Sequence, residues 1–262
     1  PAVMAELAKA GRLHGACMTV SRRSMGDNLD GIAVMDPEVI LPYDRPLREN
    51  AGFLVLGGNL FDTALMKTSV ISPEFRARFL EQPGHEGIFE ARAVVFEGPE
   101  DYHARINDAA LQIDEQTILF IRNVGCIGYP GSAEVVNMQP PDAVLRKGIK
   151  HLPTVGDGRQ SGTSESPSIL NASPEAVVGG GLAYLQTGDR VQLDLNACTL
   201  NAMVDDAEWQ SRKDAWQPPE IRNQTPWQEI YRTHVGQLGE GGCLELATAY
   251  RGVARDLPRD NH

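Results

Sequence analysis

Short apolar runs that each end at glycine or proline constrain the fold of this chain most. Residues 117–121 (TILFI) form a continuous run of this kind, which leads into a loop bounded by Gly125 and Gly131. Residues 53–56 (FLVL) end in the same way, at Gly57. A continuous apolar run of this length, closed by a turn, is typical of a strand that is buried on both faces. We therefore expect several short buried strands.

The remaining runs favour a mixed sheet with few helices. Residues 91–96 are a further expected strand, and we expect 182–185 and 190–195 to form a hairpin across a Thr-Gly-Asp turn. Two short runs that end at proline, 32–35 and 39–41, are expected at the rim of a sheet. The pattern indicates an α/β fold with a β-barrel-like or curved mixed sheet. Flanking helices are expected over 1–10, 100–107, 141–148 and 207–216, and from Thr225 onwards.

Composition excludes several classes of function. The chain has 262 residues and a net charge of −11, and it has no cluster of lysine and arginine of the kind that binds nucleic acid. We therefore expect no nucleic-acid partner. No apolar run approaches the length of a membrane span, so we expect a cytoplasmic protein without a membrane partner. The four cysteines share no C-x-x-C spacing, which argues against a zinc site or a disulfide framework.

The stretch that begins Gly156-Asp157-Gly158 and continues Arg-Gln-Ser-Gly-Thr-Ser predicts a tight polar loop that holds a ligand. Glycines free backbone N–H groups for an anion, and Ser161 and Thr163 place hydroxyls beside them. The spacing does not fit the dinucleotide fingerprint G-x-G-x-x-G or the nucleophile elbow G-x-S-x-G. The alternative from these residues alone is a surface loop rich in serine and glycine.

A wider set of motifs extends over the whole chain. They include DGRQSGTS followed by SPSILNASPEA, together with GRLHGACMTV, FLVLGGNLFDTALMKTSVIS, GYPGSAEVVNMQPP, TPWQEIYRTHVGQL and the terminal PRDNH. In this order they resemble the carboxy-terminal portion of the dihydroxy-acid and phosphogluconate dehydratase family. The likeness is to its sugar-acid branch, the pentonate and hexonate dehydratases such as L-arabinonate dehydratase.

The resemblance implies a fold and a set of site residues. It implies a swivelling, aconitase-like β-barrel domain in which Ser161 is the base that removes the C2 proton of a 2,3-dihydroxy acid. Thr163 matches a second hydroxyl that orients the substrate or supports the serine. Glu134 matches a magnesium ligand, and a hard oxygen ligand suits Mg²⁺. A [2Fe–2S] cluster would act on the C3 hydroxyl, with its cysteines outside this chain. The implied activity is that of a hydro-lyase that forms a 2-keto-3-deoxy acid.

The resemblance also bears on domains and partners. We expect residues 1–262 to be one carboxy-terminal catalytic-base domain, whose first helix, 1–10, continues from an amino-terminal domain that is absent here. The expected partners are a sugar-acid substrate, that amino-terminal domain and further copies of the chain, as a dimer or a dimer of dimers. The domain is expected to be inactive without its amino-terminal half. The alternative is a stand-alone domain that binds a sugar acid or a protein without catalysis.

Four further residues have open interpretations. Cys126 lies in the loop near Glu134 and is either a ligand or, as we prefer, a packing residue. Lys67 is either a contact for a substrate carboxylate or a surface lysine. Glu165 would raise the pKa of the serine, and so oppose its action as a base, if its carboxylate pointed inward. His262 ends a distinctive tail that we expect to pack at a subunit interface.

Overall fold

The computed structural model describes residues 1–47, 49, 51–160 and 165–250, which divide into two compact units, Pro1–Ala51 and Gly52–His262. The first unit contains the helices α1 (Ala2–Lys9) and α2 (Met25–Leu29). Its described residues form no strand, so the expected rim strands at 32–35 and 39–41 are wrong. These two runs are mostly exposed and have no partner strand, and a short apolar run forms a strand only where another strand pairs with it.

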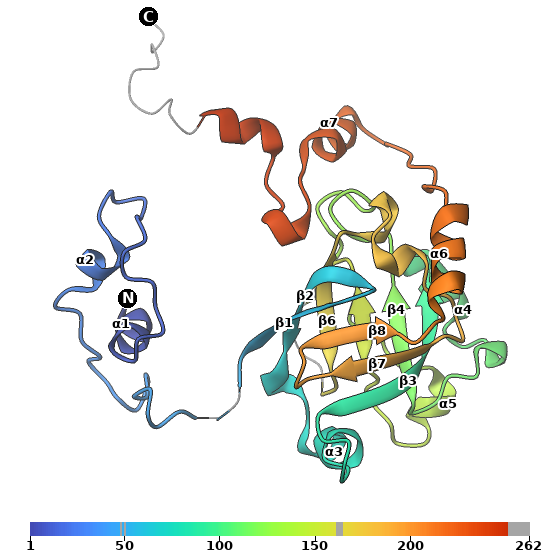
Figure 1. Cartoon of the computed structure of the whole chain (residues 1–262), viewed down its shortest axis with the longest axis horizontal. Helices are drawn as coiled ribbons and strands as arrows, with labels where there is room; N and C mark the ends of the chain where they lie inside the picture. The colour runs from blue at the N-terminus through green and yellow to red at the C-terminus, as the bar shows by residue number, and fades with distance from the viewer. Residues whose placement is uncertain (48, 50, 161–164, 251–262) are drawn as a thin grey trace, which may run out of the picture. The chain divides into compact units, whose positions relative to one another are not determined.

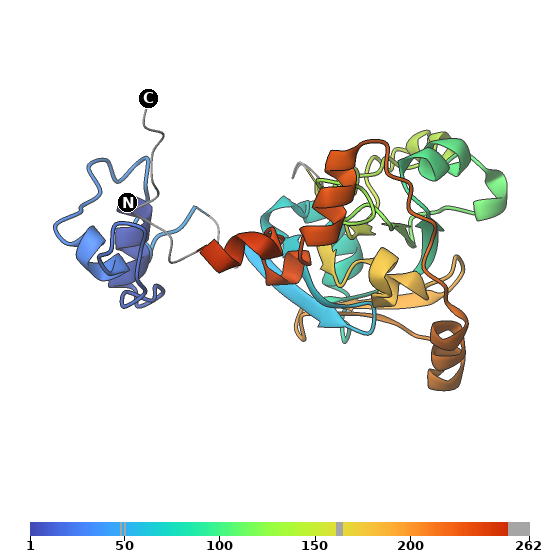
Figure 2. The ribbon, with the colours of Figure 1, turned by 90° about the horizontal axis from the view of Figure 1, so that it is seen from above.

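The second unit is built around a closed barrel of eight strands (Figures 1 and 2). The order around the barrel is β1-β2-β6-β5-β4-β3-β7-β8. This mixed barrel with helices outside it confirms the predicted α/β, barrel-like class. The strands are β1 (Phe53–Gly58), β2 (Phe61–Lys67), β3 (Ile88–Phe96), β4 (Thr117–Ile121), β5 (Thr154–Gly156), β6 (Ser168–Ser173), β7 (Arg190–Asp194) and β8 (Thr199–Ala202).

The barrel combines a parallel half and an antiparallel half. β3, β4, β5 and β6 are parallel neighbours, whereas β1 with β2, β2 with β6, β3 with β7 and β7 with β8 pair antiparallel. The barrel closes through a single parallel pair between β1 and β8, Gly57 with Thr199. The parallel half brings the carboxyl ends of four strands to the same edge.

The apolar run of β4 is continuous because both faces of the strand are buried. Ile118 and Phe120 belong to the core that fills the barrel. Leu119 and Ile121 point the other way, into a second core on the outside of the barrel. All four side chains are at most 1% exposed. Successive side chains of β4 therefore point alternately into two cores, instead of into one core and the solvent.

Helices lie outside the barrel (Figure 1). Asp205 caps α6 through the N–H of Ala207, and Thr225 caps α7 through the N–H of Gln228 with proline in the first turn. The predicted helices over 207–216 and from Thr225 are thereby confirmed. The helices of this unit are α3 (Pro73–Phe75), α4 (Pro99–Arg105), α5 (Asp142–Leu145), α6 (Asp206–Ala215) and α7 (Pro226–His234), with 3₁₀ turns at Thr68–Val70, Ala109–Leu111, Ala176–Val178, Gly181–Ala183, Leu238–Glu240 and Glu245–Tyr250 and a π-turn at Arg76–Leu80.

The predicted hairpin of 182–185 with 190–195 is wrong. Residues 181–183 form a 3₁₀ turn, and β7 pairs instead with β8, Val191 opposite Ala202. The carbonyls of the turn accept hydrogen bonds from the side chain of Arg122, so they are not available to a strand ladder. No helix among the described residues is both long and apolar enough to cross a membrane.

Candidate active site at the carboxyl edge of the barrel

The carboxyl ends of the four parallel strands meet at one edge of the barrel. β3, β4, β5 and β6 end at Phe96, Ile121, Gly156 and Ser173. Loops that follow the carboxyl ends of parallel strands commonly form ligand sites. We call the segments 97–98, 122–134, 157–160 and 174–176 the carboxyl edge, and it is the candidate site.

Asp157 is the buried centre of the carboxyl edge. Its carboxylate is fully buried and accepts hydrogen bonds from the backbone N–H groups of Val124 (2.9 Å), Ala176 (2.8 Å) and Asn123 (3.1 Å). These donors lie on the segments after β4 and β6, while Asp157 follows β5. One carboxylate therefore joins three of the four segments.

Burial raises the pKa of Asp157 to about 6, because the charged form loses its hydration. The backbone N–H groups act in the opposite direction, since they stabilise the carboxylate, and the nearby charge of Glu175 adds to the rise. Asp157 is therefore ionised at neutral pH, and it titrates close to the physiological range.

Glu175 is a second buried carboxylate, 2% exposed. It accepts hydrogen bonds from the backbone N–H groups of Ile127 (3.0 Å) and Gly128 (2.9 Å) and from Nε2 of Gln237 (3.0 Å). It directly follows Pro174, whose peptide bond to Ser173 is cis. Glu175 thereby fixes the loop after β4 from the segment after β6.

The segment from α7 onward closes over the same loop. Arg232 in α7 donates from Nε to the carbonyl of Ile127 (2.7 Å) and from Nη2 to that of Gly128 (3.2 Å). Farther along, the N–H of Gly239 donates to Oγ of Ser173 (3.1 Å). The loop after β4 is thus held by Glu175, which follows β6, and by Arg232 of α7.

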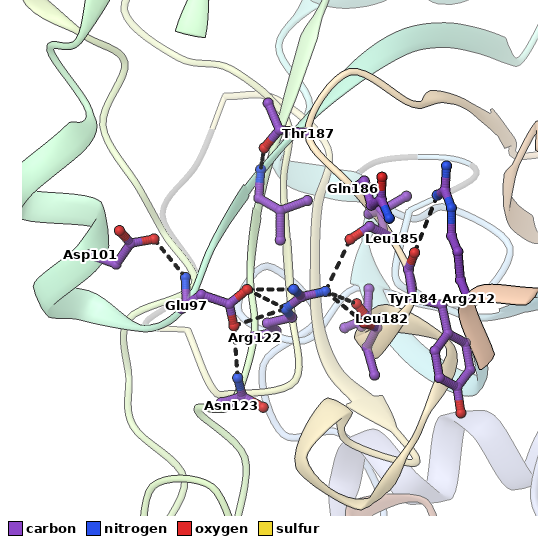
Figure 3. A network of polar contacts seen from close by, with 12 residues as sticks. Glu97, Asp101, Arg122, Asn123, Leu182, Tyr184, Leu185, Gln186, Thr187 and Arg212 are labelled. Carbon is purple, nitrogen blue, oxygen red and sulfur yellow. Dashed lines mark hydrogen bonds and ion pairs between the residues drawn. The ribbon is translucent and has the colours of Figure 1, made fainter. Parts of the chain in front are cut away.

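Arg122 holds the edge from the other side (Figure 3). Its Nε lies 2.9 Å and 3.0 Å from the two carboxylate oxygens of Glu97, which also accepts from Nδ2 of Asn123 (3.0 Å). Its Nη1 donates to the carbonyls of Leu182 (2.7 Å) and Ala183 (3.0 Å) in the 3₁₀ turn and to that of Leu185 (3.0 Å), two residues after the turn. The segments after β3 and β4 are therefore tied to each other and to the 181–186 turn.

Glu134 and Arg159 are paired at this edge, but their side chains form no ion pair with each other. They form an isolated parallel bridge, flanked by hydrogen bonds from Arg159 N to Ala133 O (2.9 Å) and from Val136 N to Arg159 O (3.2 Å). Paired residues of a bridge present their side chains to the same face. Yet no ion pair joins the two side chains, and the carboxylate of Glu134 has no partner among the described residues.

Two buried oxygen atoms near this pair also lack partners. Oγ of Ser132 and Oδ1 of Asn171 are buried and have no hydrogen-bond partner within the described ranges. Both residues have positive φ, 58° and 56°, which is uncommon for residues other than glycine. The N–H of Asn171 donates to Gly158 O (2.8 Å), so both residues border the 157–160 segment. Unpartnered buried oxygens of this kind commonly mark a place where a ligand or a water binds.

The predicted hydroxyls of Ser161 and Thr163 lie outside the described residues, as does the His262 tail. The structure does describe the segment that leads to them. It brings Glu134 into direct pairing with Arg159, which precedes Ser161 by two positions in the sequence. The roles of Ser161, Thr163 and Glu134 stay predictions.

The structure favours the packing interpretation of Cys126. Its thiol is 3% exposed, and burial raises its pKa, with a hydrogen bond to Tyr231 acting in the opposite direction. A metal ligand is a thiolate, which this environment disfavours. Within the described part of the chain, no group of three or more histidine, cysteine, aspartate or glutamate side chains is placed to hold a metal ion.

Lys67 and Glu165 lie away from the carboxyl edge. β2 is antiparallel to β6, with Met66 opposite Ile169, so Lys67 lies near the amino end of β6. Glu165 precedes the same end, and its carboxylate is 66% exposed and 3.6 Å from Nε2 of His151. The carboxylate of Glu165 therefore lies beside His151, and its effect on the Ser161 hydroxyl, which lies outside the described residues, stays a prediction.

Sequence reasoning assigned no role to Asp157, Glu175 or Arg159. A signal was present for the first, since an acid between two glycines directly after a strand has little purpose except to bind backbone N–H groups or a ligand. The roles of the other two depend on contacts with segments more than 20 residues away. Such contacts leave no local pattern.

Known proteins with similar sequences fall in one family. A sequence model described as the C-terminal part of dihydroxy-acid and 6-phosphogluconate dehydratases matches residues 38–242. The D-xylonate dehydratase of Caulobacter vibrioides is 60% identical over 262 residues, which are 100% of this chain and 44% of that protein. The L-arabinonate dehydratase of Rhizobium leguminosarum bv. trifolii is 37% identical, over 100% of this chain and 43% of that protein.

A dihydroxy-acid dehydratase of Clostridium beijerinckii is 34% identical over 94% of this chain and 42% of that protein. The chain thus spans less than half the length of the curated relatives that it matches. These similarities confirm the predicted resemblance to the family and to its sugar-acid branch.

Proposed function

Because the chain belongs to the dihydroxy-acid and 6-phosphogluconate dehydratase family, we propose that it is the part of a sugar-acid dehydratase that supplies the catalytic base. The proposed substrate is a pentonate such as D-xylonate, and the product is the 2-keto-3-deoxy acid. The name of the 60% identical relative, D-xylonate dehydratase, supports this choice of substrate.

One observation carries the proposal. At the carboxyl edge, the side chains of Glu134 and Arg159 share one face. The carboxylate of Glu134 has no partner among the described residues, and the guanidinium of Arg159 donates there only through Nε, to the carbonyl of Ser132. Arg159 precedes Ser161 by two positions. Opposite charges that share a face without forming an ion pair are suited to a ligand that bears both a bound cation and an anionic group. A pentonate with a divalent ion is a ligand of this kind.

In the proposed reaction, Ser161 takes the proton from C2 of the substrate. Serine is a weak base at its ordinary pKa, so its alkoxide needs positive charge and N–H donors nearby. A divalent ion bound beside Glu134 would supply that positive charge. We assign Thr163 to orient the substrate or to support the serine.

The atoms balance without a further reactant. The proton leaves C2, and the C3 hydroxyl leaves with its bonding electrons; together they make up one water. The carbon skeleton is left as an enol between C2 and C3, which takes up a proton at C3 and releases the proton of its C2 hydroxyl to give the 2-keto-3-deoxy acid.

Glu134 fits one position of a Mg²⁺ site, because it offers an oxygen ligand to which no described residue donates a hydrogen bond. When bound, Mg²⁺ would polarise the substrate carboxylate and C2 hydroxyl and so acidify the C2 proton. The described residues supply no second or third ligand, so the remaining ligands must come from elsewhere in the enzyme.

The described residues do not fit a [2Fe–2S] cluster. Cys126 is a buried thiol whose pKa is raised, and the other cysteines form no cluster with it. We propose that the cluster is bound by an amino-terminal domain, which is also required for activity. A homo-oligomer and a cytoplasmic location stay predictions.

The test compares two glutamate variants of the full-length protein. Glu134→Gln should lower the affinity for Mg²⁺, measured by titration, and should slow the dehydration of D-xylonate by ~100-fold or more, since the lost ligand is charged. Glu165→Gln is the matched control at the other end of the barrel, and it should retain the wild-type rate. If Glu134→Gln kept both the Mg²⁺ affinity and the rate, the proposed site would be wrong; if the wild type dehydrated no pentonate, the proposed activity would be wrong.

A further inference from the structure

We propose that Arg159 binds the carboxylate of the acid substrate, which makes it a binding residue beside the predicted base and metal ligand. This inference rests on the proposed function, because it assumes that the ligand at the carboxyl edge is a sugar acid. Arg159 would then be the residue that selects an acid over a neutral sugar.

The backbone of Arg159 is fixed on both sides. Its N–H donates to Ala133 O (2.9 Å), and its carbonyl accepts from Val136 N (3.2 Å). Gly158, the preceding residue, leaves no room for a side chain: an added Cβ would lie 2.7 Å from Ala133 O and 2.9 Å from a methyl group of Val124. The position of Arg159 is therefore determined by close packing against the 124–136 loop.

The side chain of Arg159 is also oriented, and only one of its nitrogens is used. Its Nε donates to the carbonyl of Ser132 at 2.7 Å. The two terminal Nη atoms have no partner among the described residues. An arginine held through Nε keeps the outer edge of its guanidinium free, and that edge matches a carboxylate with two parallel hydrogen bonds.

Two other arginines that contact the carboxyl edge, Arg122 and Arg232, use their terminal nitrogens in hydrogen bonds. Arg122 uses its nitrogens on the carboxylate of Glu97 and on three carbonyls. Arg232 uses all three nitrogens, on the carbonyls of Ile127 and Gly128 and on the 222–223 segment. Both have structural partners that account for their charge. Arg159 has none.

A second, independent observation points to a ligand at the same place. Ser132 provides the carbonyl that orients Arg159, and its own hydroxyl is buried, 2% exposed, without a partner in the described part of the chain. A buried hydroxyl without a partner costs free energy, and a polyhydroxy ligand would provide the missing hydrogen bond. The guanidinium and the hydroxyl together suit an anion that carries hydroxyl groups.

The charges around Arg159 also favour an incoming anion. Cys126 and Tyr231 are near it and are neutral, since burial raises the pKa of both side chains, that of Tyr231 to about 12. Glu134 shares its face but forms no ion pair with it. If Glu134 is bound to a divalent ion, no ion pair among the described residues neutralises the positive charge of Arg159 before the substrate binds.

The experiment uses the full-length protein with Arg159→Gln and Arg159→Lys, and with Arg146→Gln as the control for the loss of one positive charge. Arg146 is exposed and lies 3.9 Å from Asp142 in its own helical turn. Arg159→Gln should raise the KM for D-xylonate by ~30-fold with kcat within about threefold of wild type, since a contact made equally in the ground and transition states affects KM. Arg159→Lys, which keeps the charge but loses the planar fork, should give an intermediate KM.

A binding measurement accompanies the kinetics. Calorimetric titration with 3-deoxy-pentonate, which keeps the carboxylate and C2 hydroxyl but has no C3 leaving group, should show a parallel loss of affinity in Arg159→Gln and none in Arg146→Gln. A lower kcat with unchanged KM and a shifted pH profile would overturn the proposal, because Arg159 would then act on the serine alkoxide. An unchanged KM and an unchanged affinity in Arg159→Gln would also overturn it. The proposed function would stand in that case, provided that the wild type dehydrated D-xylonate.

Discussion

The acidic residues of the carboxyl edge divide into two kinds. Asp157 and Glu175 are buried, and each accepts hydrogen bonds from backbone N–H groups of neighbouring loops. Glu134 is exposed and has no such partner in the described ranges. Carboxylates that are already satisfied by backbone N–H groups position loops, whereas an unsatisfied one at the same edge is available to a ligand.

The titration of Asp157 gives a stability prediction at this scale. The pKa of Asp157 in the folded protein, about 6, lies above its ordinary value of 3.8, so the folded state binds this proton more tightly than the unfolded state does. The stabilisation is therefore complete below about pH 4 and is lost as the pH rises through 6. The free energy of unfolding should fall by about 3 kcal/mol across this range because of Asp157 alone.

The measurement is urea unfolding at a series of pH values from 4 to 7, for the wild type and Asp157→Asn. The variant cannot titrate at this position, whereas all other groups titrate in both proteins. The difference between the two pH profiles should therefore show the Asp157 contribution and its sign. Parallel profiles would contradict the assignment.

At the scale of elements, Arg122 should be the strongest single connection between the barrel and the 181–186 turn. Its side chain is only 18% exposed, and it serves Glu97 and three carbonyls. Arg122→Leu would leave those carbonyls without a donor. We expect a loss of about 2–3 kcal/mol in the free energy of unfolding.

Arg190→Leu is the matched control for that prediction. Arg190 also pairs with a glutamate, Glu90, but its side chain is 69% exposed and that of Glu90 is 42% exposed. Exposed pairs of this kind contribute less than about 1 kcal/mol. Equal losses in the two variants, measured by urea unfolding, would show that the contacts of Arg122 with the turn contribute little.

The sequence predicted those elements whose pattern is local. The run at 117–121 identified β4, because burial on both faces leaves no charged residue in the strand and only one polar residue, Thr117. The segment 182–185 looked like a strand for the same reason. Its backbone is held instead by Arg122, which is 60 residues away in the sequence at Leu182, and no local pattern contains such a contact.

The candidate site was predictable to a similar extent. The resemblance to the family implied Glu134 as a metal ligand, and the structure pairs Glu134 with Arg159, which precedes the Ser161 segment. The structural role of Asp157 was not predictable, because its partners lie on two other strands' loops. Distant segments that meet at one edge of a barrel are visible only once the strand order is known.

At the scale of the whole molecule, the two compact units lead to a prediction about folding. The unit Gly52–His262 contains both hydrophobic cores of the barrel, and no residue of Pro1–Ala51 belongs to either core. A protein that begins at Gly52 should therefore unfold in one cooperative thermal transition, as a domain with its own core does. Calorimetry that showed no such transition would contradict this and would favour the expectation of one domain over 1–262.

The chain by itself cannot complete the proposed metal site. It spans less than half of its curated relatives, and its described residues include one available carboxylate at the carboxyl edge, Glu134. A divalent ion needs several ligands. We therefore propose that this chain supplies the base, the substrate-binding arginine and one metal ligand, and that another part of the enzyme supplies the remaining ligands.

The rate at which deuterium leaves C2 of 2-deuterated D-xylonate tests the central claim most directly. It is measured with the full-length wild type and with Ser161→Ala, while calorimetry with 3-deoxy-pentonate checks that binding is retained. The account predicts that Ser161→Ala binds normally and loses deuterium at least ~1,000-fold more slowly, as expected for removal of a base. Loss of deuterium within a few-fold of the wild-type rate would contradict the assignment of Ser161 as the base.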